Sequence, residues 1–256
     1  MGHLLEVSAS TLASTVRNWK GSYGSKSVVQ PDKPIRLYDR ENCPECRLAR
    51  EALTELNLDA EIYPCPEGGH RYLDTATEES NGEGVPLLID LNTGEKAVGA
   101  HGIATYLFRQ YKHARAPQRL TGEGLSLVTS KLATLVRRQH GKAARPSRPA
   151  EKLLTLYSFE SSPFSRLVRE RLCEYELAYR LINLGKQQLA DIGPAKPRLL
   201  LKPYRPLENT KRWDFWKEHG NVQVPYLIDP NTDTRLFESA DILAYLDRTY
   251  GAQAVG

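Results

Sequence analysis

The sequence of 256 residues predicts a mixed α/β fold built from two copies of one structural unit. Residues 35–58 and 154–177 align without a gap at an offset of 119. Residues 85–90 and 224–229 align in the same way at an offset of 139, and both segments begin with Val-Pro. Each copy alternates short apolar strand patterns with helical patterns, which is typical of α/β proteins. The change of offset places 20 extra residues in the second copy, within 184–223.

We expect the same order of elements in both copies. A strand leads into a helix and a second strand; after a variable region come a third strand, a hairpin to a fourth strand, and a closing helix. The expected strands are 35–38, 60–63, 86–90 and 96–98 in the first copy and 154–157, 179–184, 225–229 and 235–237 in the second. The expected helices are about 44–56 and 102–111 in the first copy and about 163–175 and 241–249 in the second.

A short helix is expected before each copy, because residues 12–21 resemble residues 132–141. A duplicated helix favours a structural role over a removable targeting signal, so we expect both helices to pack on the domains. A basic amphipathic helix that lies on a membrane is the alternative. The chain then divides into an N-terminal helix and connector (1–34), a first domain (35–111), a basic linker with a helix near 123–139 (112–151), and a second domain (152–250).

The distribution of charge argues against a broad nucleic-acid surface. The net charge is +4, but residues 112–148 hold nine Lys or Arg and one Glu, so the remainder is slightly acidic. A solvated linker is the favoured interpretation of this stretch, with an acidic partner or a membrane surface as the alternative. No apolar run in the sequence approaches the roughly 18 residues that a membrane span needs.

The cysteine content favours a reducing compartment. The four cysteines at positions 43, 46, 65 and 173 are too few for the disulfide framework of a secreted protein. The first 33 residues lack the continuous apolar core of a secretory signal. We therefore expect a cytoplasmic protein. Because this segment is rich in Ser and Thr and poor in acids, as plastid transit peptides are, the plastid stroma is the alternative location if the source is eukaryotic.

The sequence Cys43-Pro44-Glu45-Cys46 follows the first expected strand and opens a helix. Proline is favoured at the first position of a helix, so Cys43 falls at the N-cap, beside unpaired backbone N–H groups. A thiolate there is stabilised, and its pKa is expected to fall below about 8.5. The charge of Glu45 opposes this effect and that of Arg47 offsets it. A strand, a Cys-x-x-Cys and a helix in this order are typical of a thioredoxin-like redox site.

The second copy has Ser162-Pro163-Phe164-Ser165 at the same place and therefore has no thiol there. Ser162 is either an activating hydroxyl or the mark of a copy that only binds. Elsewhere, Cys65 is interpreted as an ordinary loop cysteine in preference to a resolving thiol or a zinc ligand with Cys43, Cys46 and His70. Cys173 is expected in the core. The aromatic residues of the second-copy insert are expected to pack on a hydrophobic surface or on the other domain; they are Tyr204, Trp213, Phe215 and Trp216.

These motifs resemble those of glutaredoxins and of glutathione S-transferase N-terminal domains, which share the thioredoxin fold. The resemblance covers about 35–111 and 152–250 and rests on the helix start, the Val-Pro strand, the hairpin and the closing helix, each present twice. It implies two tandem thioredoxin-like domains. It also implies that both Val-Pro bonds are cis and that these turns bind the cysteinyl backbone of glutathione, at Val85-Pro86 and Val224-Pro225.

The resemblance implies different carboxylate sites in the two copies. Residues Val98 to Gly102 resemble the Gly-Gly turn of glutaredoxins, where backbone N–H groups hold the γ-glutamyl carboxylate. Residues Phe237 to Asp241 resemble the Glu-Ser motif of transferases, in which the serine hydroxyl holds it. The glutathione-binding residues implied in this way are Tyr38, Val85, Pro86, Gly99, Ala100 and His101 in the first copy and Val224, Pro225, Glu238 and Ser239 in the second.

The sequence therefore predicts a glutathione-linked thiol–disulfide oxidoreductase. Cys43 is the expected nucleophile and Cys46 the resolving thiol, with glutathione and glutathionylated or disulfide substrates as partners and no metal. The second copy is expected to be a glutathione-binding or structural copy, and a homo-oligomer is left open. Two alternatives stand beside this prediction: a non-catalytic glutathione-binding or scaffold protein, and a glutathione transferase that acts through Ser162.

Overall fold

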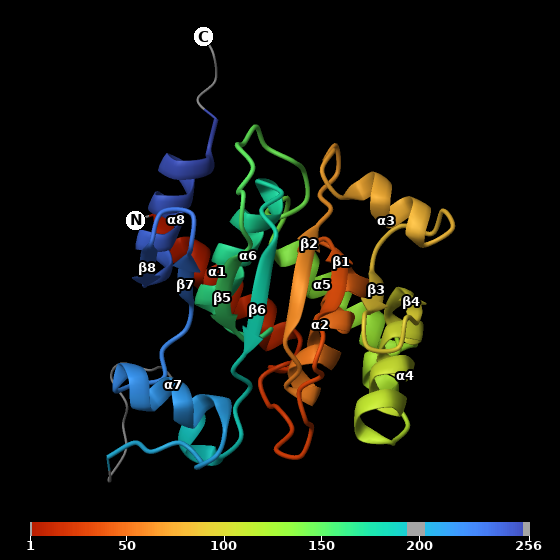
Figure 1. Ribbon diagram of the computed structural model, residues 1–256, viewed down its shortest axis with the longest axis horizontal. Helices are drawn as coiled ribbons and strands as arrows, with labels where there is room; N and C mark the ends of the chain where they lie inside the picture. Colours follow the sequence, from red (N-terminus) through yellow and green to blue (C-terminus); the bar gives the residue numbers. More distant parts are fainter. Residues whose placement is uncertain (1, 194–202, 253–256) are drawn as a thin grey trace.

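The computed structural model describes residues 2–193 and 203–252 and contains the two predicted copies, here called repeat one and repeat two (Figure 1). Each begins after a helix, α1 (Gly2–Val16) or α5 (Leu125–Val136). Repeat one consists of β1 (Ile35–Asp39), α2 (Pro44–Leu56), β2 (Ala60–Pro64), α3 (Leu73–Glu79), β3 (Leu87–Asp90), β4 (Lys96–Val98) and α4 (Gly99–Lys112). Repeat two consists of β5 (Leu154–Ser158), α6 (Pro163–Glu174), β6 (Tyr179–Asn183), α7 (Lys211–His219), β7 (Tyr226–Asp229), β8 (Thr234–Phe237) and α8 (Ser239–Tyr250).

The predicted fold class is confirmed, and the closing helices begin earlier than the sequence predicts. Helix α4 starts at Gly99 and α8 at Ser239. Of the residues expected to bind a carboxylate at these helix starts, Gly99, Ala100, His101 and Ser239 lie in the first helical turn, and Glu238 is the N-cap of α8. Among the described residues, no helix is both long enough and apolar enough to span a membrane.

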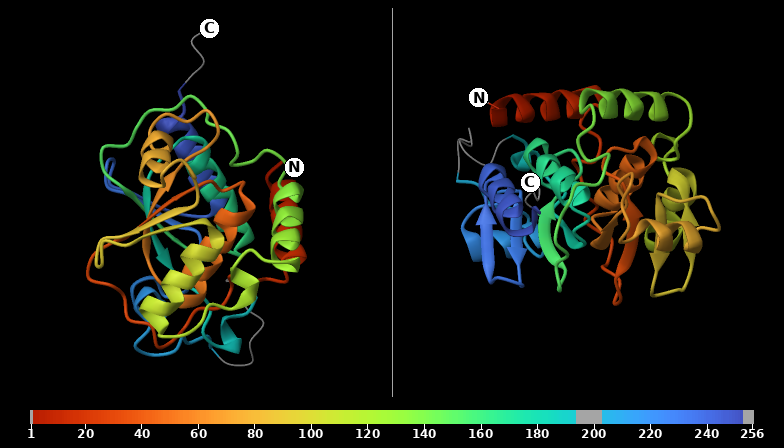
Figure 2. Two further views of the ribbon diagram at one scale, coloured as in Figure 1. Left: turned by 90° about the vertical axis from the view of Figure 1, so that its right-hand side faces the viewer. Right: turned by 90° about the horizontal axis from the view of Figure 1, so that it is seen from above.

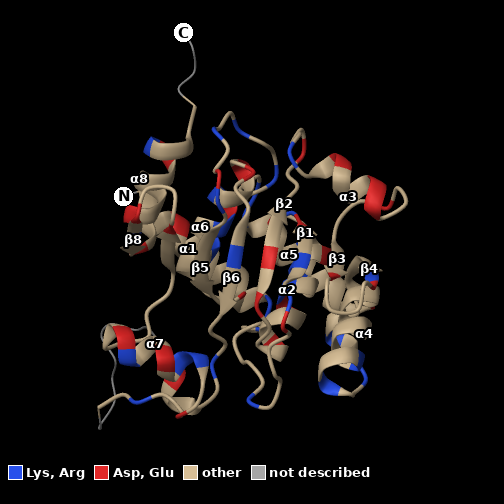
Figure 3. Cartoon of the chain, in the orientation of Figure 1, with Lys and Arg blue, Asp and Glu red and all other residues tan. Residues whose placement is uncertain are grey.

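The eight strands form one continuous sheet in the order β4-β3-β1-β2-β6-β5-β7-β8 (Figure 1). The sequence predicts two domains, each with its own set of strands, and the structure joins both sets in this one sheet. The repeats join where β2 pairs with β6 in antiparallel orientation, with Glu61 opposite Arg180 (Figure 3). Each of these strands would otherwise be an open edge with unpaired backbone groups, and their pairing satisfies those groups. One hydrophobic cluster runs through both repeats, from Ile35 to Tyr250.

Helices α1 and α5 form an outer layer over the helices that cover the sheet (Figure 2). Each packs on the first helix of the repeat that it does not directly precede: α1 lies on α6 of repeat two, and α5 lies on α2 of repeat one. The hydroxyl of Ser10 donates to the carbonyl of Pro163 at 2.8 Å, and that of Ser130 donates to the carbonyl of Pro44 at 2.8 Å. The helix that precedes repeat one thus covers the helix start of repeat two.

The insert of repeat two contributes α7, which packs on the sheet through Phe215. The side chain of Lys211 reaches repeat one, where its Nζ donates to Asp59 Oδ1 at 2.5 Å. The predicted packing role of the aromatic residues therefore holds for Phe215, which lies with Leu184 and Tyr226 in a buried cluster. Residues 194–202 of the insert lie outside the described residues.

A buried network of charges lies between α2 and α6. The guanidinium of Arg50 contacts Glu160, and that of Arg169 contacts both Glu41 and Glu160. Arg50 and Arg169 are equivalent in the sequence repeat, as are Glu41 and Glu160. All four side chains are almost completely buried. The two repeats thus share one set of ion pairs in their interior.

Candidate functional site

Cys43 occupies the N-cap of α2, as the sequence predicts. Its backbone is extended, Pro44 is the first helical residue, and Cys43 Sγ accepts a hydrogen bond from the backbone N–H of Cys46 at 3.2 Å. The hydrogen bond from the Cys46 side chain lowers the pKa of Cys43 to about 7 against the effect of burial, with help from backbone N–H groups and from Arg50. Arg47, expected to supply the positive charge, is instead buried beside Glu160.

The surroundings of Cys46, in contrast, disfavour ionisation of its thiol. Its side chain is fully buried, and its Sγ accepts a hydrogen bond from the backbone N–H of Arg40 at 3.4 Å. Burial raises the pKa of Cys46 well above its usual value, and the neighbouring Cys43 thiolate raises it further. At neutral pH the pair therefore consists of one half-buried thiol that ionises readily and one buried thiol that stays protonated.

The turn beside this pair has the predicted geometry. The Val85-Pro86 bond is cis, and the carbonyl of Pro86 accepts a hydrogen bond from the backbone N–H of Gly99 at 2.9 Å. Gly99 has a φ of +70°, which suits glycine, and it begins α4. The backbone N–H of Ala100 donates to Glu45 Oε2 at 3.4 Å. The start of α4 is thus met by a carboxylate of the chain itself.

Two other predicted residues of repeat one lie apart from this contact. The side chain of His101 is largely exposed, with its Nδ1 3.4 Å from Glu123 Oε1. Tyr38 is buried and stacks on Tyr63 with ring centroids 5.0 Å apart. The structure places Tyr38 in a small buried cluster together with Leu87.

Repeat two presents the corresponding positions without a thiol. Ser162 caps α6, and its Oγ accepts a hydrogen bond from the backbone N–H of Ser165 at 3.3 Å. The Val224-Pro225 bond is cis. Glu238 has a φ of +64° at the position that Gly99 takes in repeat one. Such a conformation costs a non-glycine residue roughly 1–3 kcal/mol and is concentrated at functional sites.

The side chains around the start of α8 are polar. Glu238 Oε1 accepts a hydrogen bond from Gln223 Nε2 at 2.6 Å. Ser239 is the first residue of α8 and is buried, with its Oγ 3.3 Å from Nε2 of His3 in α1. A hydroxyl and an imidazole therefore meet at the helix terminus where the sequence predicts that a carboxylate binds.

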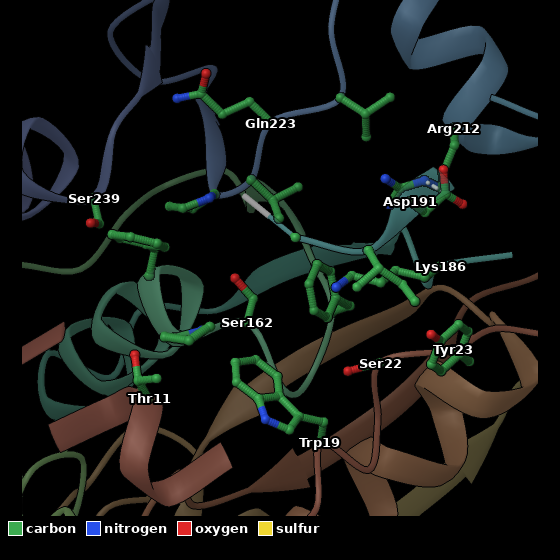
Figure 4. A pocket seen from close by; sticks show the side chains of 18 of the residues that line it. Thr11, Trp19, Ser22, Tyr23, Ser162, Lys186, Asp191, Arg212, Gln223 and Ser239 are labelled. Atoms are coloured by element: carbon green, nitrogen blue, oxygen red, sulfur yellow. Dashed lines mark ion pairs between the residues drawn. The ribbon is translucent and has the colours of Figure 1, made fainter. Parts of the chain in front are cut away.

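A cavity of about 580 Å³ opens beside these residues (Figure 4). It brings together five of the residues predicted for repeat two: Ser162, Val224, Pro225, Glu238 and Ser239. Its volume falls in the range of small-molecule sites, which are roughly 300–1,000 Å³. The lining is more apolar than polar, as in most such sites.

Part of the cavity wall comes from segments that sequence reasoning did not connect with repeat two. Thr11 of α1, then Trp19 and Tyr23 of the following connector, line the side opposite Gln223 (Figure 4). Lys186 and Arg212 come from the insert region. The repeat pattern revealed that α1 exists, but no periodicity within α1 tells which repeat it covers.

The remaining two cysteines are buried thiols. Cys65 is buried, its Sγ donates to the carbonyl of Tyr63 at 3.4 Å, and burial raises its pKa. Cys173 is buried, and its Sγ donates to the carbonyl of Gly141 at 3.4 Å. Within residues 2–193 and 203–252, no group of three or more His, Cys, Asp or Glu side chains could hold a metal ion.

Comparison with known proteins identifies both repeats. The family model of the glutathione S-transferase N-terminal domain matches residues 37–116 and again residues 156–254. Neither a curated protein nor a solved structure matches the chain significantly. The two matched segments together span well over half of the sequence and coincide with the two thioredoxin-like repeats. The chain therefore belongs to the glutathione S-transferase N-terminal domain family.

Proposed function

We propose that the protein is a glutathione-linked thiol–disulfide oxidoreductase whose reacting group is the Cys43 thiolate. The family supports a glutathione-related function of a thioredoxin fold. The observation that carries the finer proposal is the asymmetry of the cysteine pair: the pKa of Cys43 is lowered to about 7, whereas that of Cys46 is raised well above its usual value. The thiol that attacks the substrate disulfide must be ionised near neutral pH, whereas a resolving thiol can stay protonated until it attacks the mixed disulfide.

The reaction follows from this asymmetry. The Cys43 thiolate attacks a disulfide R–S–S–R′, forms the mixed disulfide Cys43–S–S–R, and releases R′–S⁻, which takes up a proton from water. Cys46 then gives its proton to water, and its thiolate attacks Cys43 Sγ and releases R–S⁻, which takes up a proton, so that a Cys43–Cys46 disulfide remains. Two molecules of glutathione reduce this disulfide and leave as oxidised glutathione.

Repeat two is proposed to bind glutathione without forming a bond to it. The cis Val224-Pro225 turn, Glu238 and Ser239 line one cavity with Ser162. The N-terminus of α8 attracts a carboxylate through its free N–H groups and its dipole, and Ser239 adds a hydroxyl donor. These features support a site for the γ-glutamyl end of the peptide.

The test of the redox function is the trapping of an intermediate. A Cys46→Ser variant treated with oxidised glutathione should gain one glutathionyl group, located at Cys43 by peptide mass spectrometry. Cys43→Ser should gain none at position 46, because Cys46 is buried and its pKa is raised. Modification at Cys46 or Cys65 instead of Cys43 would contradict the proposed role of Cys43.

A second candidate function is glutathione conjugation through Ser162. It is favoured by the position of the Ser162 hydroxyl, which lines the cavity beside apolar side chains such as Phe159 and Phe164. A Cys43→Ser variant that still conjugates glutathione to 1-chloro-2,4-dinitrobenzene, and loses this activity on Ser162→Ala, would establish it. If the protein binds glutathione but shows neither redox nor transfer activity, the remaining interpretation is a non-catalytic glutathione-binding protein.

A further inference from the structure

Glu45 places a carboxylate at the start of α4, beside the redox pair. Its Oε2 lies 3.4 Å from the backbone N of Ala100, which donates to it. The same oxygen would lie 3.5 Å from a Cβ atom at Gly99, so the carboxylate sits directly over the glycine turn. The N–H of Gly99 is already bonded to the carbonyl of Pro86. Glu45 thus engages the first N–H group of this helix that an incoming anion would use.

The equivalent position of repeat two carries no such group. Phe164 stands there in the repeat, and Ser239 stands in place of Ala100. The Ser239 hydroxyl faces Nε2 of His3 at 3.3 Å, and an imidazole is neutral or positive, never negative, in the pH range of proteins. The start of α4 is therefore met by a carboxylate from another helix, whereas Ser239 at the start of α8 faces an imidazole. The acidic residues beside Ser239 belong to the α8 terminus itself: Glu238, which is bonded to Gln223, and Asp241.

We infer that Glu45 is a specificity-determining residue of repeat one, where its carboxylate takes the place of a substrate carboxylate. Cys43 then reacts preferentially with disulfides that bring no carboxylate to the start of α4, such as protein disulfides and neutral or cationic small disulfides. Glutathione's γ-glutamyl carboxylate is held at repeat two. The preference of Cys43 among disulfides rests on its proposed redox function. The effect of Glu45 on the binding of a carboxylate does not depend on that function.

Glu45 opposes a carboxylate ligand at the start of α4 by exclusion and by repulsion. A carboxylate at a helix N-terminus is stabilised by the helix dipole and by the N–H group that it accepts from, and a second carboxylate cannot use the same N–H group. Two carboxylates that share a small site also repel each other, because like charges oppose ionisation of both. The covalent tether of Glu45 to α2 gives its carboxylate a permanent advantage over a free ligand.

The kinetic test compares two disulfides of similar size and different charge. The pre-reduced protein is mixed with oxidised glutathione or with the disulfide of glutathione diethyl ester, in which the carboxylates are esterified. The ester should react several-fold faster with the wild type, and Glu45→Ala should remove most of this preference by accelerating oxidised glutathione. Glu45→Gln separates charge from shape, and Glu83→Ala removes an equal charge from the loop before Val85 as a control.

Two kinetic outcomes would overturn the inference. Glu45→Ala could accelerate both disulfides equally, which would mean that Glu45 acts only through the thiolate of Cys43. The wild type could also show no preference for the ester. A failure of the redox function itself is recognised separately, because then no disulfide reacts with any variant.

A binding measurement is independent of the redox chemistry. S-methylglutathione keeps the γ-glutamyl carboxylate but has no free thiol. In calorimetry, the Glu45→Ala variant should bind one more molecule of S-methylglutathione per chain than the wild type, because the start of α4 becomes free. This difference is expected for any number of sites in the wild type. Glu83→Ala should match the wild type. An unchanged number of sites in Glu45→Ala would overturn the inference even if Cys43 proves to be the nucleophile.

Discussion

The guanidinium of Arg50, in repeat one, donates from Nε to Oε2 of Glu160, in repeat two, at 2.9 Å, and both side chains are almost completely buried. Arg50 also contacts Asp39 and Glu41. Removing one partner of a buried ion pair leaves an uncompensated charge in a medium that solvates it poorly. The boundary between the repeats is therefore stabilised by interactions that neither repeat can make alone.

The first prediction concerns this pair. Arg50→Met should lower the free energy of unfolding by about 3–5 kcal/mol, because three buried carboxylates lose their common partner. Urea denaturation followed by circular dichroism measures the effect. Arg36→Met is the matched control, since the Arg36–Glu61 pair on the sheet is partly exposed and should be worth less than about 1 kcal/mol. Equal losses in the two variants would contradict the assigned role of the network.

The second prediction concerns the ionisation of Cys43. The rate of its alkylation by iodoacetamide should rise with pH around a midpoint of about 7, because the thiolate is the reacting form. Cys46→Ala should move the midpoint upward, toward the roughly 8.5 of a free thiol, since it removes the hydrogen bond that lowers the pKa most. Mass spectrometry of the Cys43 peptide checks both values, and a wild-type midpoint near 8.5 would refute the prediction.

The third prediction separates the roles of the two cysteines. Cys43→Ser should abolish reduction of both a glutathionylated peptide and a protein disulfide. Cys46→Ser should keep much of the first activity, because free glutathione can replace the resolving thiol, and should lose most of the second. Rates are measured with glutathione and a coupled assay for oxidised glutathione. Two single variants that both match the wild type would rule out the mechanism.

The fourth prediction concerns the cavity of repeat two. Ser239→Ala should weaken the binding of S-methylglutathione by about ten- to a hundredfold, as expected for the loss of a hydrogen bond to a charged group of roughly 1.5–3 kcal/mol. Calorimetry of the full chain is the measurement. Ser8→Ala is the control, because Ser8 lies on the exposed side of α1 and its hydroxyl donates to the carbonyl of Leu4. Identical affinities in the two variants would show that the ligand does not use α8.

The sequence predicted the local parts of the fold well because each has a local cause. Pro44 fixes the helix start and places Cys43 at its N-cap. The apolar alternation of β1 and the Val-Pro steps repeat in both halves, and both Val-Pro bonds are cis, as the resemblance implies. Such features depend on neighbours within a few residues, and a duplicated chain displays each of them twice.

The parts that sequence reasoning missed depend on contacts between distant residues. The pairing of β2 with β6 requires two edges to meet, and no pattern within either strand names its partner. Glu45 was interpreted only through its neighbour Cys43, although its oxygen contacts Ala100, 55 positions away. Trp19 and Tyr23 join the cavity because α1 crosses to repeat two. Surface complementarity decides these contacts, and periodicity does not report it.

The pairing of β2 with β6 also has a consequence for synthesis on the ribosome. Strand β2 ends at Pro64, whereas β6 begins at Tyr179, more than a hundred residues later. At 5–20 residues per second, the nascent chain carries the open β2 edge for roughly ten seconds. The separation between α1, which ends at Val16, and its partner α6, which begins at Pro163, is longer still. During this interval the half-made protein presents an unpaired strand to other chains, and translation of repeat two closes it.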